Sequence, residues 1–123
     1  MVDSRPAILI AEDQIFIALE AERILSETFD CSVEICRRDR LADALAEKRF
    51  DLIVLEFSGV EEEDSHYVAL TRAAGAQLLL LTASNDLADV SRSFPDVPLI
   101  QKPFNETEVR AFIERLLMGV QPG

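Results

Sequence analysis

Residues 50–59, with the sequence FDLIVLEFSG, decide how the rest of the chain is expected to fold. They contain an unbroken apolar run, residues 52–55, that is followed at once by the acid Glu56. Leu, Ile and Val without polar alternation are typical of a strand buried on both faces, as in a parallel sheet covered by helices. Ligands of such sheets bind at the carboxyl ends of the strands. Glu56 is therefore the first residue whose presence needs a functional explanation.

The composition of the 123-residue chain indicates one folded domain over residues 1–123. Its net charge of −11, from 12 basic and 23 acidic residues, argues against nucleic acids and anionic membrane surfaces as partners. No apolar run approaches the roughly 20 residues of a membrane-spanning helix. Cys31 and Cys36 fit no metal-binding spacing, so we interpret both as reduced packing residues and expect a cytoplasmic protein.

Apolar strands alternate with amphipathic helices along the whole chain. Asn105 is expected to cap the last helix, with Glu108 as its capping-box partner. Strands are expected at residues 7–11, 32–36, 51–56, 77–82 and 97–101, and helices at residues 14–28, 37–48, 61–74, 86–94 and from Asn105 onward. This alternation predicts a doubly wound α/β domain with five helices around a five-stranded parallel sheet of order 2-1-3-4-5.

In this order, polar residues that follow four of the five strands meet at one edge of the sheet. Glu12, Asp13, Glu56, Thr82 and Lys102 form this group. Carboxylate oxygens suit Mg²⁺, which also takes water and a phosphate oxygen as ligands. The hydroxyl and the ammonium group are suited to hydrogen-bond and neutralise a phosphoryl group. The sequence therefore predicts a site for a phosphoryl group and a divalent cation.

Four segments carry a family resemblance: ILIAED at residues 8–13, DLIVLE at 51–56, LLLLTAS at 78–84 and IQKPF at 100–104. In order and spacing they resemble the receiver domain of two-component response regulators, over essentially the full length of the chain. The resemblance implies a flavodoxin-like fold and a bacterial signalling role without enzymatic activity. It also implies that residues 1–123 are a single receiver domain with no output domain.

The resemblance assigns a role to each residue of the predicted site. Asp13, and less directly Glu12, would bind Mg²⁺ together with the residue at position 56. Thr82 and Lys102 would contact the phosphate. Position 56 is where the family carries the aspartate that accepts a phosphoryl group from a histidine kinase, and here it is Glu56.

Glutamate in place of aspartate at position 56 is the difference from the family that bears most on phosphorylation. Its extra methylene moves the carboxylate by about 1.5 Å, and a misplacement of about 1 Å can cost roughly a hundredfold in rate. Glu56 would either pair with Lys102 and imitate the phosphorylated state, or block the pocket. Binding of Mg²⁺ is accordingly expected to be weak or absent.

Further departures agree with an atypical receiver. Leu99 stands where the family has an aromatic switch residue, and Val60 stands where a proline follows the acceptor. We therefore expect a module that is not phosphorylated at the usual site and acts by protein–protein interaction. Two alternatives stay open: a receiver that is phosphorylated in a Mg²⁺-dependent way on Glu56 or another acid, and a small Mg²⁺-dependent phosphohydrolase.

The partner is expected to be a protein, either a histidine kinase or another signalling protein, with a homodimer as the other candidate. Ile15, Phe16 and Leu19 fall outside the apolar stripe of the first helix, and contiguous exposed apolar residues often mark an interface. The acidic run at residues 61–64 is expected to be the solvated start of a helix, favoured there by the helix dipole.

Overall fold

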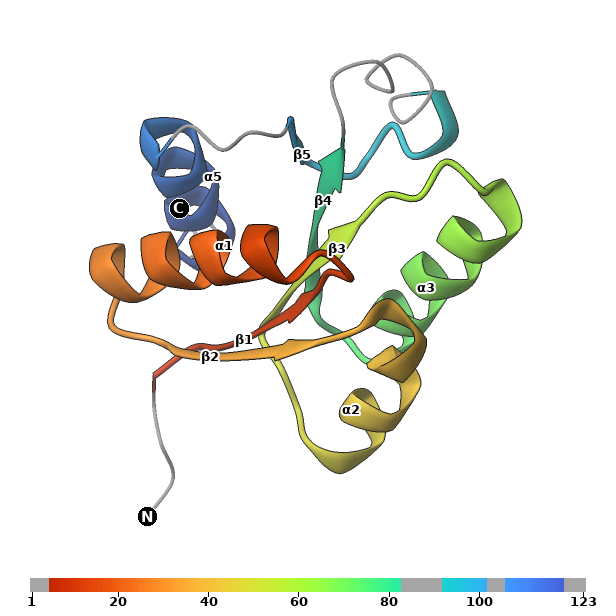
Figure 1. The fold of residues 1–123 in the computed structure, drawn as a ribbon, viewed down its shortest axis with the longest axis horizontal. Helices are drawn as coiled ribbons and strands as arrows, with labels where there is room; N and C mark the ends of the chain where they lie inside the picture. The colour runs from red at the N-terminus through yellow and green to blue at the C-terminus, as the bar shows by residue number, and fades with distance from the viewer. Residues whose placement is uncertain (1–4, 83–91, 102–105, 119–123) are drawn as a thin grey trace.

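The computed structural model describes residues 5–82, 92–101 and 106–118 (Figure 1). The described part contains five strands, four α-helices and one 3₁₀ helix, η1. In chain order they are β1 (Ala7–Ala11), α1 (Ile15–Thr28), β2 (Ser32–Cys36), η1 (Arg38–Arg40), α2 (Leu41–Glu47), β3 (Leu52–Glu56), α3 (Glu61–Ala73), β4 (Gln77–Thr82), β5 (Leu99–Gln101) and α5 (Glu106–Met118).

The predicted fold class is confirmed. All five strands are parallel, and their order is β2-β1-β3-β4-β5. The central strand is therefore β3, which lies within the stretch at residues 50–59. Its residues Leu52 to Leu55 are buried, as expected for a strand covered on both faces. The edge position of β2 agrees with its alternating sequence.

Two boundaries differ from the predicted ones by more than one residue. The second helix begins as η1, in which the Arg40 amide donates to the Arg37 carbonyl at 3.0 Å, and becomes α-helical only at Leu41. The fifth strand covers Leu99–Gln101 instead of residues 97–101. The predicted helix at residues 86–94 falls mostly outside the described residues, and so does the predicted cap Asn105.

Helices cover both faces of the sheet (Figure 1). The helices α1 and α5 pack on one face, through Ile24 of α1 and Ile113 of α5. The helices α2 and α3 pack on the other, through Leu41 and Val68. Among the described residues, no helix combines the length and the apolar character needed to cross a membrane.

The first helix has an apolar side that the fold leaves exposed. Its buried residues are Ala18, Ala21, Ile24 and Leu25, whereas the predicted stripe had the partly buried Ile17 in place of Ala18. Ile15, Phe16 and Leu19 lie on the surface, and Phe16 is 85% exposed. The prediction that these three side chains stay outside the core is confirmed.

Candidate functional site

Two of the predicted site acids lie together where β1 and β3 end. Glu56 is the last residue of β3, and its Oε1 accepts a hydrogen bond from the Asp13 amide at 3.3 Å. Glu12, the residue after β1, is buried, and its Oε2 accepts a hydrogen bond from the Gln14 amide at 3.1 Å. The parallel strands thus bring Asp13 and Glu56, 43 residues apart, to one edge of the sheet.

The structure gives positions for two of the three other predicted site residues. Thr82 ends β4 and is fully buried, one residue beyond Leu81, which pairs with Glu56 in the sheet register. Leu99 pairs with Leu80 and packs into the core between the sheet and the helices α2 and α3. Lys102 lies outside the described residues.

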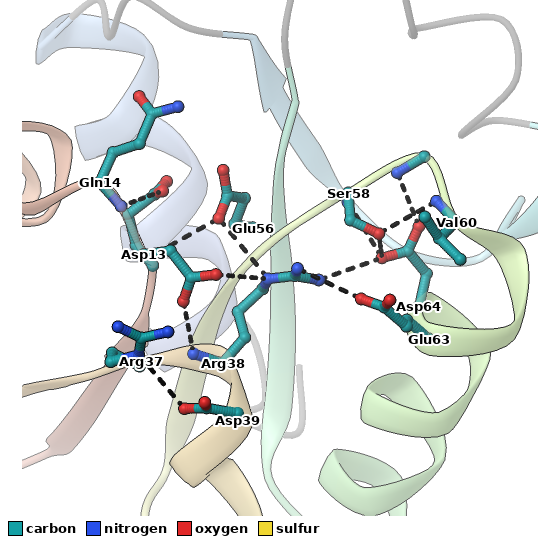
Figure 2. Close-up of polar contacts among 12 residues, drawn as sticks. Asp13, Gln14, Arg37, Arg38, Asp39, Glu56, Ser58, Val60, Glu63 and Asp64 are labelled. Atoms are coloured by element: carbon teal, nitrogen blue, oxygen red, sulfur yellow. Dashed lines mark hydrogen bonds and ion pairs between the residues drawn. The ribbon is translucent and has the colours of Figure 1, made fainter.

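A basic side chain that the sequence did not predict occupies the centre of the site (Figure 2). Arg38 is the first residue of η1, just after β2, and its side chain is only 14% exposed. Its Nε lies 3.5 Å from Asp13 Oδ2 and 3.6 Å from Glu56 Oε1. Its Nη2 lies 3.3 Å from Glu63 Oε1, and its Nη1 lies 3.8 Å from Asp64 Oδ1.

The backbone and a ring also hold Arg38 in place. Its amide donates a hydrogen bond to Asp13 Oδ1 at 2.9 Å, so the same carboxylate contacts both the backbone and the guanidinium. The guanidinium carbon lies 5.6 Å from the centroid of the Tyr67 ring, a distance suited to a cation–π contact. Burial alone lowers the pKa of Arg38, but Asp13, Glu56 and Glu63 together raise this pKa above its ordinary value. The side chain is therefore a permanent cation.

The prediction that residues 61–64 are merely solvated is wrong for Asp64. This residue is only 1% exposed, and its carboxylate accepts hydrogen bonds from the Ser58 amide at 3.0 Å, the Ser58 hydroxyl at 2.9 Å and the Gly59 amide at 3.0 Å. Gly59 has a φ of 89°, which a glycine adopts without strain. Asp64 thus ties the loop after β3 to the first turn of α3.

The two cysteines, Cys31 and Cys36, form no disulfide, and only Cys36 lies near the site. Cys36 ends β2, two residues before Arg38. Burial, followed by the nearby charges of Asp13, Asp39 and Glu34, raises the pKa of Cys36 to about 11. Its thiol therefore stays protonated at neutral pH, in agreement with the predicted packing role.

The arrangement does not fit the Mg²⁺ that the family resemblance implies. Mg²⁺ needs oxygen ligands at about 2.0–2.1 Å in octahedral geometry. Within residues 5–82, 92–101 and 106–118, no three acidic, histidine or cysteine side chains are arranged to hold a metal ion. The Nε of Arg38 lies within 3.6 Å of both Asp13 and Glu56, two of the acids that the family resemblance assigns to the metal ion (Figure 2).

Comparison with known proteins identifies the architecture. No family model and no curated protein matches this sequence. A response regulator receiver protein from Burkholderia phymatum is 15% identical with a TM-score of 0.78, over 93% of this chain and 96% of its own. The signal receiver domain of an HD domain-containing protein from Pseudomonas fluorescens Pf-5 is 20% identical with a TM-score of 0.79, over 97% and 91%. The chain has the receiver fold.

A third solved structure agrees with this assignment. The signal receiver domain of a signal transduction histidine kinase from Syntrophus aciditrophicus is 24% identical with a TM-score of 0.76 and covers 96% of this chain and 94% of its own. The receiver fold therefore occurs here on a sequence that shares less than a quarter of its residues with these structures.

Within the receiver fold, the position of Arg38 explains why it escaped prediction. The second strand was expected at the edge of the sheet, and the predicted site contained residues from the ends of the other four strands only. All parallel strands end at the same edge, so the residues after β2 also border the site. Because Arg37 and Arg38 directly follow the second predicted strand, the same rule could have placed them at the site.

Proposed function

We propose that this chain is an atypical receiver in bacterial two-component signalling, one that is not phosphorylated at Glu56 and acts by binding a protein partner without catalysing a reaction. The position of Glu56 carries the proposal. It ends the central strand, where the family resemblance places the aspartate acceptor.

The contacts of Glu56 support the absence of phosphorylation. Its Oε1 accepts the Asp13 amide and lies 3.6 Å from the Arg38 guanidinium, and its side chain is only 14% exposed. A carboxylate that is held by an amide and a cation is a weaker nucleophile than a free one, and its longer side chain shifts the oxygen from the position for in-line attack.

The exposed side of α1 supports a role in protein–protein interaction. Ile15, Phe16 and Leu19 are adjacent on one helix, and exposed apolar groups of this kind mark interaction surfaces. A second copy of the chain would bring another charge of −11 to this surface. We therefore favour a different signalling protein, with an apolar pocket and a basic rim, over a homodimer.

The cellular setting follows from the proposed role. Two-component receivers act where histidine kinases present their phosphorylated domains, and the two free cysteines suit a reducing compartment. We therefore place the protein in the cytoplasm.

Mass spectrometry of the intact protein tests the proposal. The purified chain is incubated with acetyl phosphate and MgCl₂, beside a receiver that has an aspartate acceptor as the positive control. We expect the control to gain the mass of a phosphoryl group and the chain to keep its mass. A stable phosphoryl adduct on the wild-type chain would contradict the proposal and favour a phosphorylatable receiver. Continuous release of phosphate above the buffer rate would instead favour a phosphohydrolase.

A further inference from the structure

Four carboxylates from three separate parts of the chain face one cation at the edge of the sheet. Asp13 follows β1, Glu56 ends β3, and Glu63 and Asp64 lie in the first turn of α3. All four lie within 3.8 Å of a nitrogen of the Arg38 guanidinium. Figure 2 shows the guanidinium between the first two acids and the last two.

Such an arrangement requires positive charge. Asp64 and Glu56 are largely withdrawn from water, and like charges in a partly buried site repel each other more strongly than in bulk solvent. A divalent cation bound through carboxylate oxygens is one way to balance such charge. Here an arginine of the chain itself supplies the charge.

The guanidinium contacts the acids mainly through its charge. Its Nε and Nη1 are buried, and neither forms a hydrogen bond with any described residue. Their distances of 3.5–3.8 Å to the carboxylates are ion-pair distances, longer than the roughly 2.7–3.2 Å of an N–H···O hydrogen bond. Only Nη2 donates, to Glu63 Oε1 at 3.3 Å. The side chain thus lies among four carboxylates and forms an ion pair with each of them, without bidentate hydrogen bonds to any one.

We propose that Arg38 is a built-in cation that takes the place of a divalent metal ion at this site, so that the native pocket excludes Mg²⁺ and opens to it only when Arg38 is removed. The Arg38 Nε lies 3.5 Å from Asp13 Oδ2 and 3.6 Å from Glu56 Oε1, so a metal ion bound at about 2 Å to these oxygens would be repelled by the guanidinium charge beside it. The inference goes beyond the proposed function and does not depend on it, because it concerns the cation and not the phosphoryl group.

Calorimetric titration with MgCl₂ and MnCl₂ tests the exclusion directly. The wild-type chain is compared with Arg38→Ala, Arg38→Gln and the control Arg40→Ala. Arg40 belongs to the same short helix, but it lies on the surface, where it pairs with Asp43 at 3.3 Å. We expect no saturable binding to the wild type or to Arg40→Ala in the low millimolar range. Both Arg38 variants should bind Mn²⁺ at least about tenfold more tightly than the wild type.

A double variant tests whether the metal binds in this pocket. Adding Glu56→Gln to Arg38→Gln removes one carboxylate ligand, and we expect it to abolish the new binding. Binding that persists unchanged in this double variant would place the metal elsewhere and overturn the proposal, as would submillimolar binding by the wild type.

Thermal unfolding provides a second test of metal binding, which also applies if Arg38→Ala is less stable than the wild type. We expect Mg²⁺ or Mn²⁺ to raise the melting temperature of the Arg38 variants and to leave that of the wild type unchanged. Equal shifts in all three proteins, or shifts in none while the variants remain folded, would overturn the proposal.

Discussion

The carboxylate of Asp13 binds Arg38 twice, once at the backbone and once at the side chain. Its Oδ1 accepts the Arg38 amide at 2.9 Å, and its Oδ2 lies 3.5 Å from the Arg38 Nε. The residue that the family resemblance assigns to the metal therefore fixes both the start of η1 and the direction of the arginine that follows. The loop after β1 and the helix start after β2 are joined by this pair.

Replacing Asp13 with Ala should lower the free energy of unfolding by about 1–2 kcal/mol, because a backbone donor and a guanidinium lose a shared acceptor. The matched control is Asp39→Ala, which removes an exposed ion pair with Arg37 at 3.4 Å and should cost less than about 0.5 kcal/mol. Urea unfolding measured in EDTA checks both. Equal losses in the two variants would contradict the structural role of Asp13.

Replacing Asp64 with Ala should be more costly, by about 2–4 kcal/mol, because three hydrogen-bond donors of residues 58 and 59 lose their buried acceptor. Glu61→Ala, a change in the same turn but on the exposed side, is the control and should be nearly neutral. Denaturant unfolding gives both values, and a loss below about 1 kcal/mol for Asp64→Ala would show that the loop does not depend on it.

Replacing Glu56 with Asp restores the family's acceptor residue but leaves Arg38 in the pocket. We expect this variant to keep its mass with acetyl phosphate and MgCl₂, because the cation position is still filled. The variant with both Glu56→Asp and Arg38→Ala should accept a phosphoryl group on the aspartate oxygen, with release of acetate. Labelling of Glu56→Asp alone would show that Glu56 by itself silences the pocket.

Cys36 should react slowly with iodoacetamide at neutral pH, because its pKa of about 11 keeps the thiol protonated. In a Cys31→Ser background at about pH 8, the rate should be on the order of a hundredfold below that of free cysteine. Since the pKa is raised, the rate should still climb by about tenfold per pH unit between about pH 8 and 10. A plateau near pH 9 would contradict the raised pKa.

Replacing Phe16 with Ser should leave the melting temperature within about 2 °C of the wild type, because the side chain is 85% exposed and packs against little. The same variant should lose binding to the protein partner, which we expect to be stronger at low ionic strength because of the chain's charge of −11. Surface plasmon resonance with purified histidine kinase domains measures this. Sedimentation of the wild type as a dimer that Phe16→Ser disrupts would instead identify a second copy as the partner.

The sequence predicted the sheet well because its signals are local. Unbroken apolar runs at residues 52–55 and 78–81 specify buried strands, and Gly75, with a φ of 76°, stands just beyond the end of α3, where glycine commonly ends a helix. The convergence of Asp13 and Glu56 follows from strand order alone. These features need no knowledge of side-chain contacts between distant residues.

The ion cluster could not be predicted in the same way, because it depends on which side chains meet across the fold. Arg38 and Glu63 are separated by 25 residues, and only the folded chain brings their side chains together. The burial of Asp64 did leave a signal, since it shares one helix face with Val68 and Thr71 at i+4 and i+7. This i, i+4, i+7 spacing was missed because residues 61–64 were interpreted together as one solvated group.

The four-acid contact of Arg38 has a dynamic consequence. One side chain connects the loop after β1, the start of η1, the end of β3 and the first turn of α3. Segments that share one such connection do not open independently, so their backbone amides should exchange hydrogen with solvent in a single cooperative step. These four segments then behave as one rigid unit, where independent segments would exchange one by one.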